Sequence, residues 1–247
     1  MGPVDVLIIG GTGRARALAG LLVEAGVEVL TSLAGRTVDP LPVPGPVRHG
    51  GFGGADGLRR LLADERVRLV VNATHPFAAT MSEHASAACT AQQVPLLRLC
   101  APSWRSLPES RDWTWVADHD EAAAACTGTG PVLLTVGRQP VPHYLVLGPR
   151  PVTVRCVDPP AVDLPAGWRV LQARGPFSPD AERHLLYGAS VLVSKDSGGS
   201  EPDPKLVVAA ELGVSVVMVA RPPVSPATAE VVTAAEAAAW VQEQLSG

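Results

Sequence analysis

Short apolar runs alternate along this chain with longer segments of helix-forming residues. The first run, Val6 to Ile9, ends in a glycine cluster, and an alanine- and leucine-rich stretch follows at once. Further runs form two series, at 27–32, 47–50, 68–72 and 95–99 and then at 131–135, 152–155, 169–172, 189–193 and 214–219. Apolar strands separated by helices of about ten or more residues indicate parallel sheets. The pattern predicts an α/β fold with further helices near 55–64, 78–91, 118–126, 179–187 and 204–212.

Two similar strand–helix segments suggest that the chain consists of two related halves. Trp115–Ala123 and Val231–Ala238 each contain a short strand, a capping pair and an alanine-rich helix, the capping pairs being Asp118 with Glu121 and Thr233 with Glu236. We expect two domains, residues 1–127 and residues 128–247, with the option that a terminal strand–helix segment packs on the opposite half. Residues 101–111, rich in Pro, Ser and charge, are interpreted as a linker.

The glycine cluster after the first strand has the properties of a nucleotide-binding turn. Gly10, Gly11 and Gly13 allow a tight turn, and the helix that follows presents unpaired N–H groups suited to a phosphate. The G-x-G-x-x-G/A pattern is matched only approximately, because Thr12 stands at its second glycine and Ala15 at its third. Glycine turns also occur in α/β proteins that bind no nucleotide. The loop alone leaves both interpretations open.

The end of the second strand bears on which dinucleotide would be bound. An NAD site carries Asp or Glu about 20 residues after the glycines, where it binds the ribose hydroxyls. Here the chain has Ser32 and, shortly after it, Arg36. A hydroxyl and a guanidinium suit a 2′-phosphate, whereas a carboxylate would repel it. We therefore expect NADP(H) in preference to NAD(H), the alternative being that Arg36 is a solvated loop residue.

Composition and charge narrow the class of protein further. The 247 residues are 47% hydrophobic and 18% charged, which is typical of a globular chain. A net charge of −4 gives no basic field for nucleic acid, and no apolar run is long enough to span a bilayer. The first residues lack the features of a secretory signal, and the four cysteines have neither zinc nor disulfide-framework spacing. We expect a cytoplasmic protein with reduced thiols and no metal ligands.

Polar and glycine-rich loops follow most of the predicted strands. Because ligands of open α/β sheets bind beyond the carboxyl ends of the strands, we expect these loops to line a cleft between the two halves. The second half contributes Arg138, Arg174 and Lys195, which together suit a substrate with several carboxylates. The alternative is that they are plain surface charges at loop tips. His75, which precedes Pro76 at a strand end, is interpreted as a proton carrier or as a turn residue.

Several loop motifs occur in a fixed order within residues 4–222. Those of the first half are Gly10-Gly11-Thr12, Ser32-Leu33-Ala34-Gly35-Arg36, Gly50-Gly51-Phe52-Gly53-Gly54 and Asn72-Ala73-Thr74-His75-Pro76-Phe77-Ala78. Those of the second half are Thr135-Val136-Gly137-Arg138, Arg174-Gly175-Pro176-Phe177 with Glu182, Lys195-Asp196-Ser197-Gly198-Gly199 and Val216 to Pro222. In these motifs the chain resembles the precorrin-6A reductase family of cobalamin (vitamin B12) biosynthesis. It departs from the family's Gly-Gly-Thr-x-Glu-Gly-Arg loop, because Gly13-Arg14-Ala15-Arg16 stands here.

The resemblance implies two Rossmann-like, doubly wound parallel-sheet domains with the active site in the cleft between them. It implies an enzyme that uses NADPH to reduce one double bond of precorrin-6A, giving precorrin-6B. The residues expected to bind the cofactor are Gly10, Gly11, Thr12, Gly13, Arg16, Ser32, Arg36, Gly53, Thr74, His75 and Phe77. Those expected to bind the substrate are Arg138, Arg174, Lys195, Ser197 and Gly198, and Lys195, Asp196 and His75 are the candidate catalytic residues.

Three other functions are compatible with parts of this pattern. One is the same reduction of a cobalt-containing precorrin, in which the metal would belong to the substrate. Another is an NADP(H)-binding sensor without catalytic activity, and a third is a reductase of some other anionic small molecule. The expected partner is a small-molecule substrate, with no nucleic acid and no membrane, and the expected state is a monomer.

Overall fold

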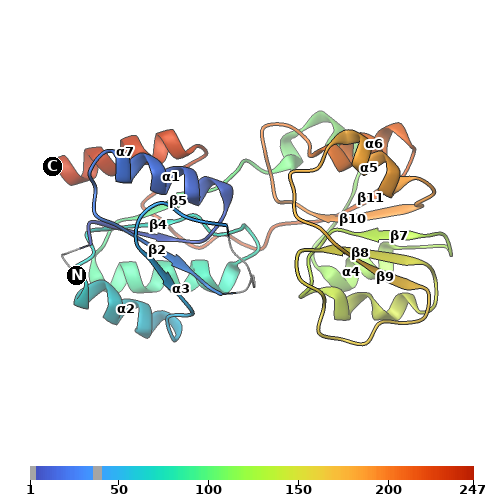
Figure 1. Ribbon diagram of the computed structural model, residues 1–247, viewed down its shortest axis with the longest axis horizontal. Helices are drawn as coiled ribbons and strands as arrows, with labels where there is room; N and C mark the ends of the chain where they lie inside the picture. The colour runs from blue at the N-terminus through green and yellow to red at the C-terminus, as the bar shows by residue number, and fades with distance from the viewer. Residues whose placement is uncertain (1–3, 36–40) are drawn as a thin grey trace. The chain divides into compact units, whose positions relative to one another are not determined.

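The computed structural model describes residues 4–35 and 41–247 and divides the chain into two compact units. Unit 1 contains the residues up to Ala101 together with Pro222–Gly247, and unit 2 contains Pro102–Arg221. The chain therefore crosses from unit 1 to unit 2 once and returns once. Each unit is a sheet with helices on both faces, as Figure 1 shows. This confirms the predicted α/β fold with parallel sheets.

Unit 1 is built on a six-stranded parallel sheet in the order β12-β5-β4-β1-β2-β3. Its strands are β1 (Val6–Ile9), β2 (Val29–Leu33), β3 (Val47–His49), β4 (Leu69–Asn72), β5 (Leu96–Leu99) and β12 (Ala229–Val231). Its helices are α1 (Gly13–Glu24), α2 (Gly54–Asp64), α3 (Ala79–Gln92) and α7 (Ala234–Ser246). The winding reverses between β1 and β4, where a doubly wound sheet binds its ligands.

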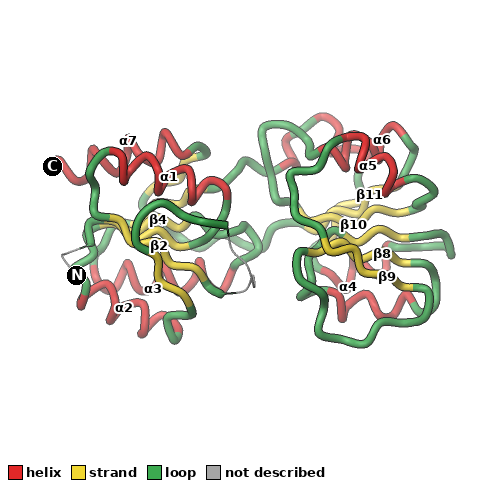
Figure 2. Tube along the Cα trace, in the orientation of Figure 1, coloured by secondary structure: helices red, strands yellow, loops and turns green. Residues whose placement is uncertain are grey.

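The sequence of β1 explains why this sheet is covered on both faces. Successive side chains of a strand point to opposite faces. Val6 and Ile8 belong to the core formed with α1 and α7, whereas Leu7 and Ile9 belong to the core formed with α2 and α3. The layering is visible along the tube of Figure 2, where α1 and α7 lie on one side of the strands and α2 and α3 on the other. A strand that is apolar on both faces is thereby buried.

Unit 2 repeats this plan with a six-stranded parallel sheet in the order β6-β11-β10-β7-β8-β9. Its strands are β6 (Thr114–Val116), β7 (Val132–Leu134), β8 (Val152–Cys156), β9 (Trp168–Gln172), β10 (Val191–Lys195) and β11 (Ser215–Val219). Its helices are α4 (His119–Ala125), α5 (Pro179–Leu186) and α6 (Pro204–Glu211), with short 3-10 helices η1 (Trp104–Ser106), η2 (Pro108–Asp112) and η3 (Val141–Leu147). Here the winding reverses between β7 and β10.

The two faces of the unit 2 sheet carry different elements. Leu133, Leu192 and Met218 lie in one core with residues of α5 and α6. Helix α4 and η3 contact each other and cover the opposite face, below the sheet in Figure 1. Lys195 is an odd number of residues from Leu192 on β10, so its side chain lies on the face of α4 and η3.

Each sheet receives one edge strand from a distant part of the chain. Strand β6 and α4 follow the first crossing and complete unit 2, whereas β12 and α7 follow the return crossing and complete unit 1. The structure therefore differs from the expected division at 127/128, because residues 102–127 belong to unit 2. The option that a terminal strand–helix segment packs on the opposite half is met by residues 222–247, which belong to unit 1. Thr233 and Glu236 form the predicted capping box of α7, whereas Asp118 caps α4 while Glu121 accepts from the N–H of Ala117. This similar local pattern does not indicate which sheet each segment joins.

Residues 101–111 are more ordered than the predicted linker. The segment contains η1 and η2, and Trp104 is 3% exposed within the core that includes α6. Pro108 is the first residue of η2, a position that needs no N–H donor. Proline and serine in this segment therefore mark short 3-10 turns against unit 2.

The described residues also bear on membrane and metal features. Within 4–35 and 41–247, no helix combines the length and the apolar composition that crossing a membrane requires. In the same ranges, no three His, Cys, Asp or Glu side chains are grouped to hold a metal ion. Cys89 and Cys126 are buried thiols, and burial raises the pKa of Cys89 to about 12 and that of Cys126 to about 11.

Candidate active site

In unit 1, the loops that follow β1 and β4 touch where the winding reverses. Gly10 has a φ of +120°, and a Cβ placed on it would lie 2.7 Å from the carbonyl oxygen of Ala73. The Thr12 hydroxyl joins the same two loops, because it donates to that oxygen at 2.9 Å. Any larger residue at position 10 would push the loops apart. The turn predicted from the glycine cluster therefore requires glycine at this position.

The start of α1 is built to receive an anion. Thr12 is the N-cap, and its Oγ1 accepts a hydrogen bond from the N–H of Ala15 at 3.2 Å. Arg16 donates from Nη1 to the carbonyl oxygen of Gly11 at 2.8 Å, which braces the loop. Gly11 and Gly13 are exposed, so the first turn remains open to a ligand. Free N–H groups at a helix start suit phosphate oxygens.

Arg14, which departs from the family's first loop, has a structural partner. Its Nε donates to the carbonyl oxygen of Val232 at 3.1 Å. Val232 lies between β12 and α7, so the side chain ties the start of α1 to the edge segment that completes the sheet. Its guanidinium is engaged there, and the departure leaves the Gly10 turn intact.

Ser32 is joined to an arginine that the sequence analysis did not select. Ser32 at the end of β2 is 3% exposed and lies beside Arg48 of β3 in the parallel register. Arg48 donates from Nη1 to the Ser32 hydroxyl at 2.8 Å, and its guanidinium lies 4.4 Å from the centre of the Phe52 ring. Its other hydrogen-bond partners are the carbonyl oxygens of Gly50 and Gly51. No carboxylate pairs with Arg48 among the residues that the structure describes.

The same edge of unit 1 carries the second glycine loop. Gly53 has a φ of +80° and is the N-cap residue of α2, where no side chain occupies the helix start. The N–H of Gly50 donates to the carbonyl oxygen of Leu33 at 2.9 Å, so this loop is tied to the end of β2. Arg36, predicted to contact a 2′-phosphate, lies outside the described residues.

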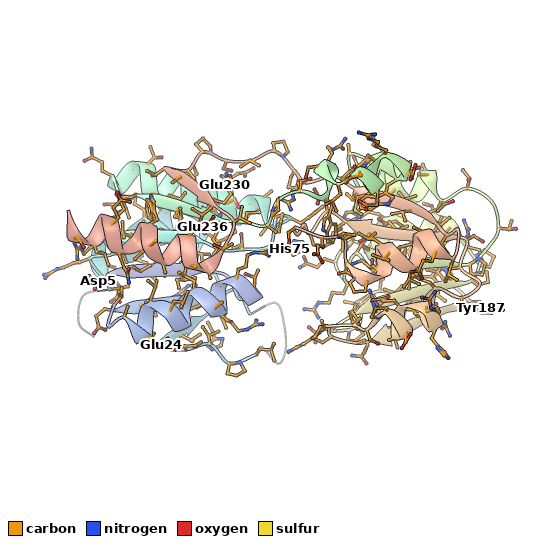
Figure 3. The ribbon with its side chains drawn as sticks, turned by 90° about the horizontal axis from the view of Figure 1, so that it is seen from above. Asp5, Glu24, His75, Tyr187, Glu230 and Glu236 are labelled. Atoms are coloured by element: carbon orange, nitrogen blue, oxygen red, sulfur yellow. The ribbon has the colours of Figure 1, made fainter. Side chains whose placement is uncertain are left out.

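The residues after β4 form a compact turn. The Asn72 side-chain oxygen accepts from the Thr74 hydroxyl at 2.7 Å and from its N–H at 3.2 Å. His75 accepts the N–H of Phe77 on Nδ1 at 3.2 Å, and the two rings lie 5.6 Å apart. In Figure 3, His75 lies at the end of unit 1 where loops follow the strands. This agrees with the turn interpretation of His75, and its role as a proton carrier stays a prediction.

In unit 2, the corresponding point carries Lys195. The loop after β7 is bound to β10, because the Thr135 hydroxyl donates to the carbonyl oxygen of Val193 at 3.0 Å. Lys195 is the last residue of β10, and burial lowers its pKa to about 8. The N–H of Ser197 donates back to the Lys195 carbonyl oxygen at 2.7 Å, and Gly198 follows with a φ of +79°. An amine with this pKa can hold or release a proton near neutral pH.

The neighbouring Asp196 is fully engaged by other groups. Its side chain is 2% exposed and accepts from the Ser103 hydroxyl at 2.5 Å and from the Trp104 N–H at 3.0 Å. Arg221 completes the set, with its Nε 3.2 Å from Asp196 Oδ2. These partners come from both chain crossings, so the geometry favours an anchoring role over the predicted chemical one. The predicted catalytic role of Asp196 stays untested.

The two predicted arginines of unit 2 follow strands β7 and β9, which flank β8. Arg138 lies near the end of β8, because its charge acts on the Cys156 thiol, whose pKa burial raises. Arg174 is exposed, and its loop is held by Phe177, whose ring lies 4.0 Å from the guanidinium of Arg155. Arg155 is in turn paired with buried Glu182 at 2.6 Å. The expected cleft stays a prediction.

Comparison with known proteins identifies relatives along almost the whole chain. The family described as "Precorrin-6x reductase CbiJ/CobK" matches residues 5–242. The precorrin-6A reductase of Rhodococcus erythropolis is 45% identical over 241 residues, 96% of each chain. That of Mycobacterium tuberculosis (strain ATCC 25618 / H37Rv) is 39% identical over 241 residues, again 96% of each. A solved structure of "CobK precorrin-6A reductase" shares 37% identity at a TM-score of 0.88 and covers 98% of this chain and 97% of its own.

Proposed function

The chain belongs to the precorrin-6x reductase family, and on this premise we propose that it reduces precorrin-6A with NADPH, giving precorrin-6B in cobalamin biosynthesis. The similarity to precorrin-6A reductases over nearly full length supports the reductase activity and the substrate class. We further propose the identity of the cofactor, the product, and the residues that bind the ligands and transfer the proton. A monomer in the cytoplasm belongs to the same proposal.

The contact between Ser32 and Arg48 is the main observation that favours NADPH over NADH. It stands at the end of β2, where a dinucleotide fold contacts the adenosine ribose. A 2′-phosphate placed there would receive a hydroxyl donor and a guanidinium with no competing carboxylate from the described residues. NADH would leave the guanidinium without an anionic partner. The residues therefore fit the phosphorylated cofactor.

Unit 1 would hold the remainder of the cofactor. Gly10 allows the two loops to approach each other, and the open first turn of α1 would bind the pyrophosphate. Gly53 at the start of α2 adds a second unobstructed helix start on the same edge. Thr74, His75 and Phe77 follow β4 next to the Gly10 turn, and we assign them to seat the nicotinamide.

The reduction requires a hydride and a proton. The nicotinamide held by unit 1 would be the source of the hydride for one carbon of the double bond, and a residue of the chain would give the proton to the neighbouring carbon. In our proposal Lys195 holds that proton, because its pKa of about 8 leaves most of the amine protonated at pH 7 and still allows transfer. Asp196, bound by Ser103, Trp104 and Arg221, would fix the position of the Lys195 backbone.

Arg138 and Arg174 would bind carboxylates of the substrate, and the loop of Ser197 and Gly198 would adjoin the reacting edge of the macrocycle. A cobalt-containing substrate would not require metal-binding residues in the protein, because the precorrin itself would carry the cobalt ion. The chain is 45% and 39% identical to two precorrin-6A reductases but 27% identical to the cobalt-precorrin-6A reductase of Priestia megaterium, which supports the metal-free substrate. A side-by-side assay of metal-free and cobalt-loaded substrate separates the two.

Exchange of Arg48 tests the cofactor assignment. We expect Arg48→Ala to raise the KM for NADPH roughly 10- to 100-fold and to leave the weak use of NADH unchanged, because one charge-assisted contact is lost. Arg59→Ala is the matched control, since Arg59 on α2 forms an exposed pair with Asp56. Equal losses with NADPH and NADH would contradict a 2′-phosphate contact at Arg48.

A further inference from the structure

A pair formed by half-buried His119 and buried Tyr144 lies on the Lys195 face of unit 2, outside the residues assigned above. His119 is the first residue of α4, and Tyr144 belongs to η3. His119 Nδ1 and the Tyr144 hydroxyl lie 2.8 Å apart, and the rings meet edge to face with centroids 5.8 Å apart. Tyr144 is fully buried, so this hydrogen bond fixes the orientation of the imidazole.

The strand register brings this pair towards Lys195. Lys195 pairs with Val219, and Val219 pairs with Val116, so the three residues form one row across the sheet. Three positions beyond Val116 the chain reaches His119, on the sheet face that α4 and η3 cover. Lys195 stands on that same face, and its charge acts on the imidazole of His119. The pair therefore belongs to the edge that carries the proposed proton donor.

The hydrogen bond with Tyr144 favours one of the two ring nitrogens of His119 as the site of the proton. The Tyr144 hydroxyl has His119 Nδ1 as its hydrogen-bond partner among the described residues, and donating to it is the arrangement that uses the hydroxyl proton. The imidazole proton then resides on Nε2. Burial, followed by the charges of Lys195 and His143, lowers the pKa of His119 to about 4, and burial raises the pKa of Tyr144. At pH 7 His119 is thus a neutral donor through Nε2–H.

The acidic groups around His119 are directed elsewhere. Asp118 accepts the N–H groups of Asp120 and Glu121 at 2.9 Å as the cap of α4. Asp120 pairs with Nδ1 of His143 at 2.7 Å, and the His143 ring lies 5.7 Å from that of His119. His119 Nε2 is bound by none of these carboxylates in the described part of the chain. Its donor is available for an external acceptor.

We propose that His119, oriented by Tyr144, is a further substrate-binding residue that donates from Nε2–H to a carboxylate of the tetrapyrrole held beside Lys195. This inference rests on the proposed function, because it takes the polycarboxylate macrocycle as the ligand. A neutral donor next to a cationic amine binds an anion without adding a second buried charge, whose desolvation would be costly. Tyr144 is then a positioning residue for His119.

Two substitutions at His119 separate its two nitrogens. The amide of Asn falls near the Nδ1 position, so His119→Asn keeps the contact with Tyr144 and removes the outer donor. The longer Gln places its amide near Nε2 and retains that donor. We expect His119→Asn to raise the KM for precorrin-6A about tenfold or more with the KM for NADPH unchanged. His119→Gln should recover most of the loss, and Tyr144→Phe should fall between them.

Controls distinguish this inference from the proposed function and from a folding defect. His143→Asn removes the neighbouring exposed imidazole and should leave both KM values near those of the parent protein. Thermal unfolding of each variant reports on folding. If the parent protein oxidises NADPH with precorrin-6A but His119→Asn has an unaltered substrate KM, the inference about His119 is overturned and the proposed function stands. If the parent protein shows no precorrin-dependent oxidation, the proposed function itself fails.

Discussion

Asp196 and Arg221 form an ion pair, 3.2 Å from Oδ2 to Nε, that joins the strand carrying Lys195 to the second chain crossing. The Arg221 guanidinium also donates to the carbonyl oxygen of Pro102 at 3.2 Å, which lies at the first crossing. The buried carboxylate of Asp196, the residue after Lys195, is therefore connected to both chain crossings. The pair holds the backbone of the proposed proton donor in place.

Breaking the pair of Asp196 and Arg221 should lower the free energy of unfolding more than it lowers the rate of the reaction. Asp196→Asn removes the carboxylate charge paired with the largely buried guanidinium of Arg221, and we expect the free energy of unfolding to fall by roughly 3 kcal/mol. Glu230→Gln is the matched control, because it breaks a pair with Arg98 whose acid is 56% exposed. That change should cost less than about 1 kcal/mol. Denaturant unfolding measures both. A variant at Asp196 with parental stability and a lost rate would instead indicate a chemical role.

Gly10 should not tolerate even one added carbon. In Gly10→Ala the new Cβ would lie 2.7 Å from a backbone oxygen, at a residue whose φ is +120°. We therefore expect the free energy of unfolding to fall by roughly 1–3 kcal/mol and NADPH binding to be lost. Gly20→Ala in α1 is the control, because its Cβ would make an ordinary contact at 3.8 Å and favour the helix. Fluorescence titration with NADPH and thermal unfolding report the two effects. Unaltered NADPH binding by Gly10→Ala would contradict the proposed role of this turn.

The pH dependence of the reaction should follow Lys195. Because burial lowers its pKa from 10.5 to about 8, the amine is protonated below that pH and neutral above it. We expect the single-turnover rate of NADPH oxidation to be level below pH 8 and to fall about tenfold per pH unit above it. Lys195→Met should be slow and show no such inflection. A parental profile that is level up to pH 10 would exclude Lys195 as the proton donor.

His119 should make the protein sensitive to mild acid. Its folded-state pKa of about 4 lies below the ordinary value of 6.5, so the unfolded chain binds the proton more readily between these values. The stability that depends on neutral His119 is complete above pH 6.5 and is lost as the pH falls towards 4. We expect His119→Asn to lose less stability than the parent protein between pH 6.5 and 4.5 in denaturant titrations. Parallel curves would contradict the neutral state of His119 in the folded protein.

Local sequence patterns predicted the features that depend on local physics. The strand Val6–Ile9 is apolar on both faces and is buried on both, and the pair Thr233 and Glu236 forms the predicted capping box. The glycine at position 10 stands where two loops approach each other. These features depend on residues that are close in sequence, so periodicity or spacing is enough to predict them.

Features set by distant residues were not predicted. Nothing in β6 or β12 distinguishes the sheet that each joins, because both are short strands followed by capped helices. Arg48 reaches Ser32 only through the register of β3 on β2, which the sequence does not state. The sequence around Asp196 resembles that of a reactive loop. Its burial depends instead on Trp104 and Arg221, which come from the two chain crossings.

The most direct test of the account is anaerobic mixing of the protein with NADPH and precorrin-6A while the absorbance of the reduced nicotinamide and of the macrocycle is followed. We expect loss of NADPH in step with a change of the macrocycle spectrum, one equivalent for each equivalent of substrate, and no comparable reaction with NADH. Binding of NADPH without any precorrin-dependent oxidation would contradict the central claim and favour an NADP(H)-binding sensor or a different anionic substrate.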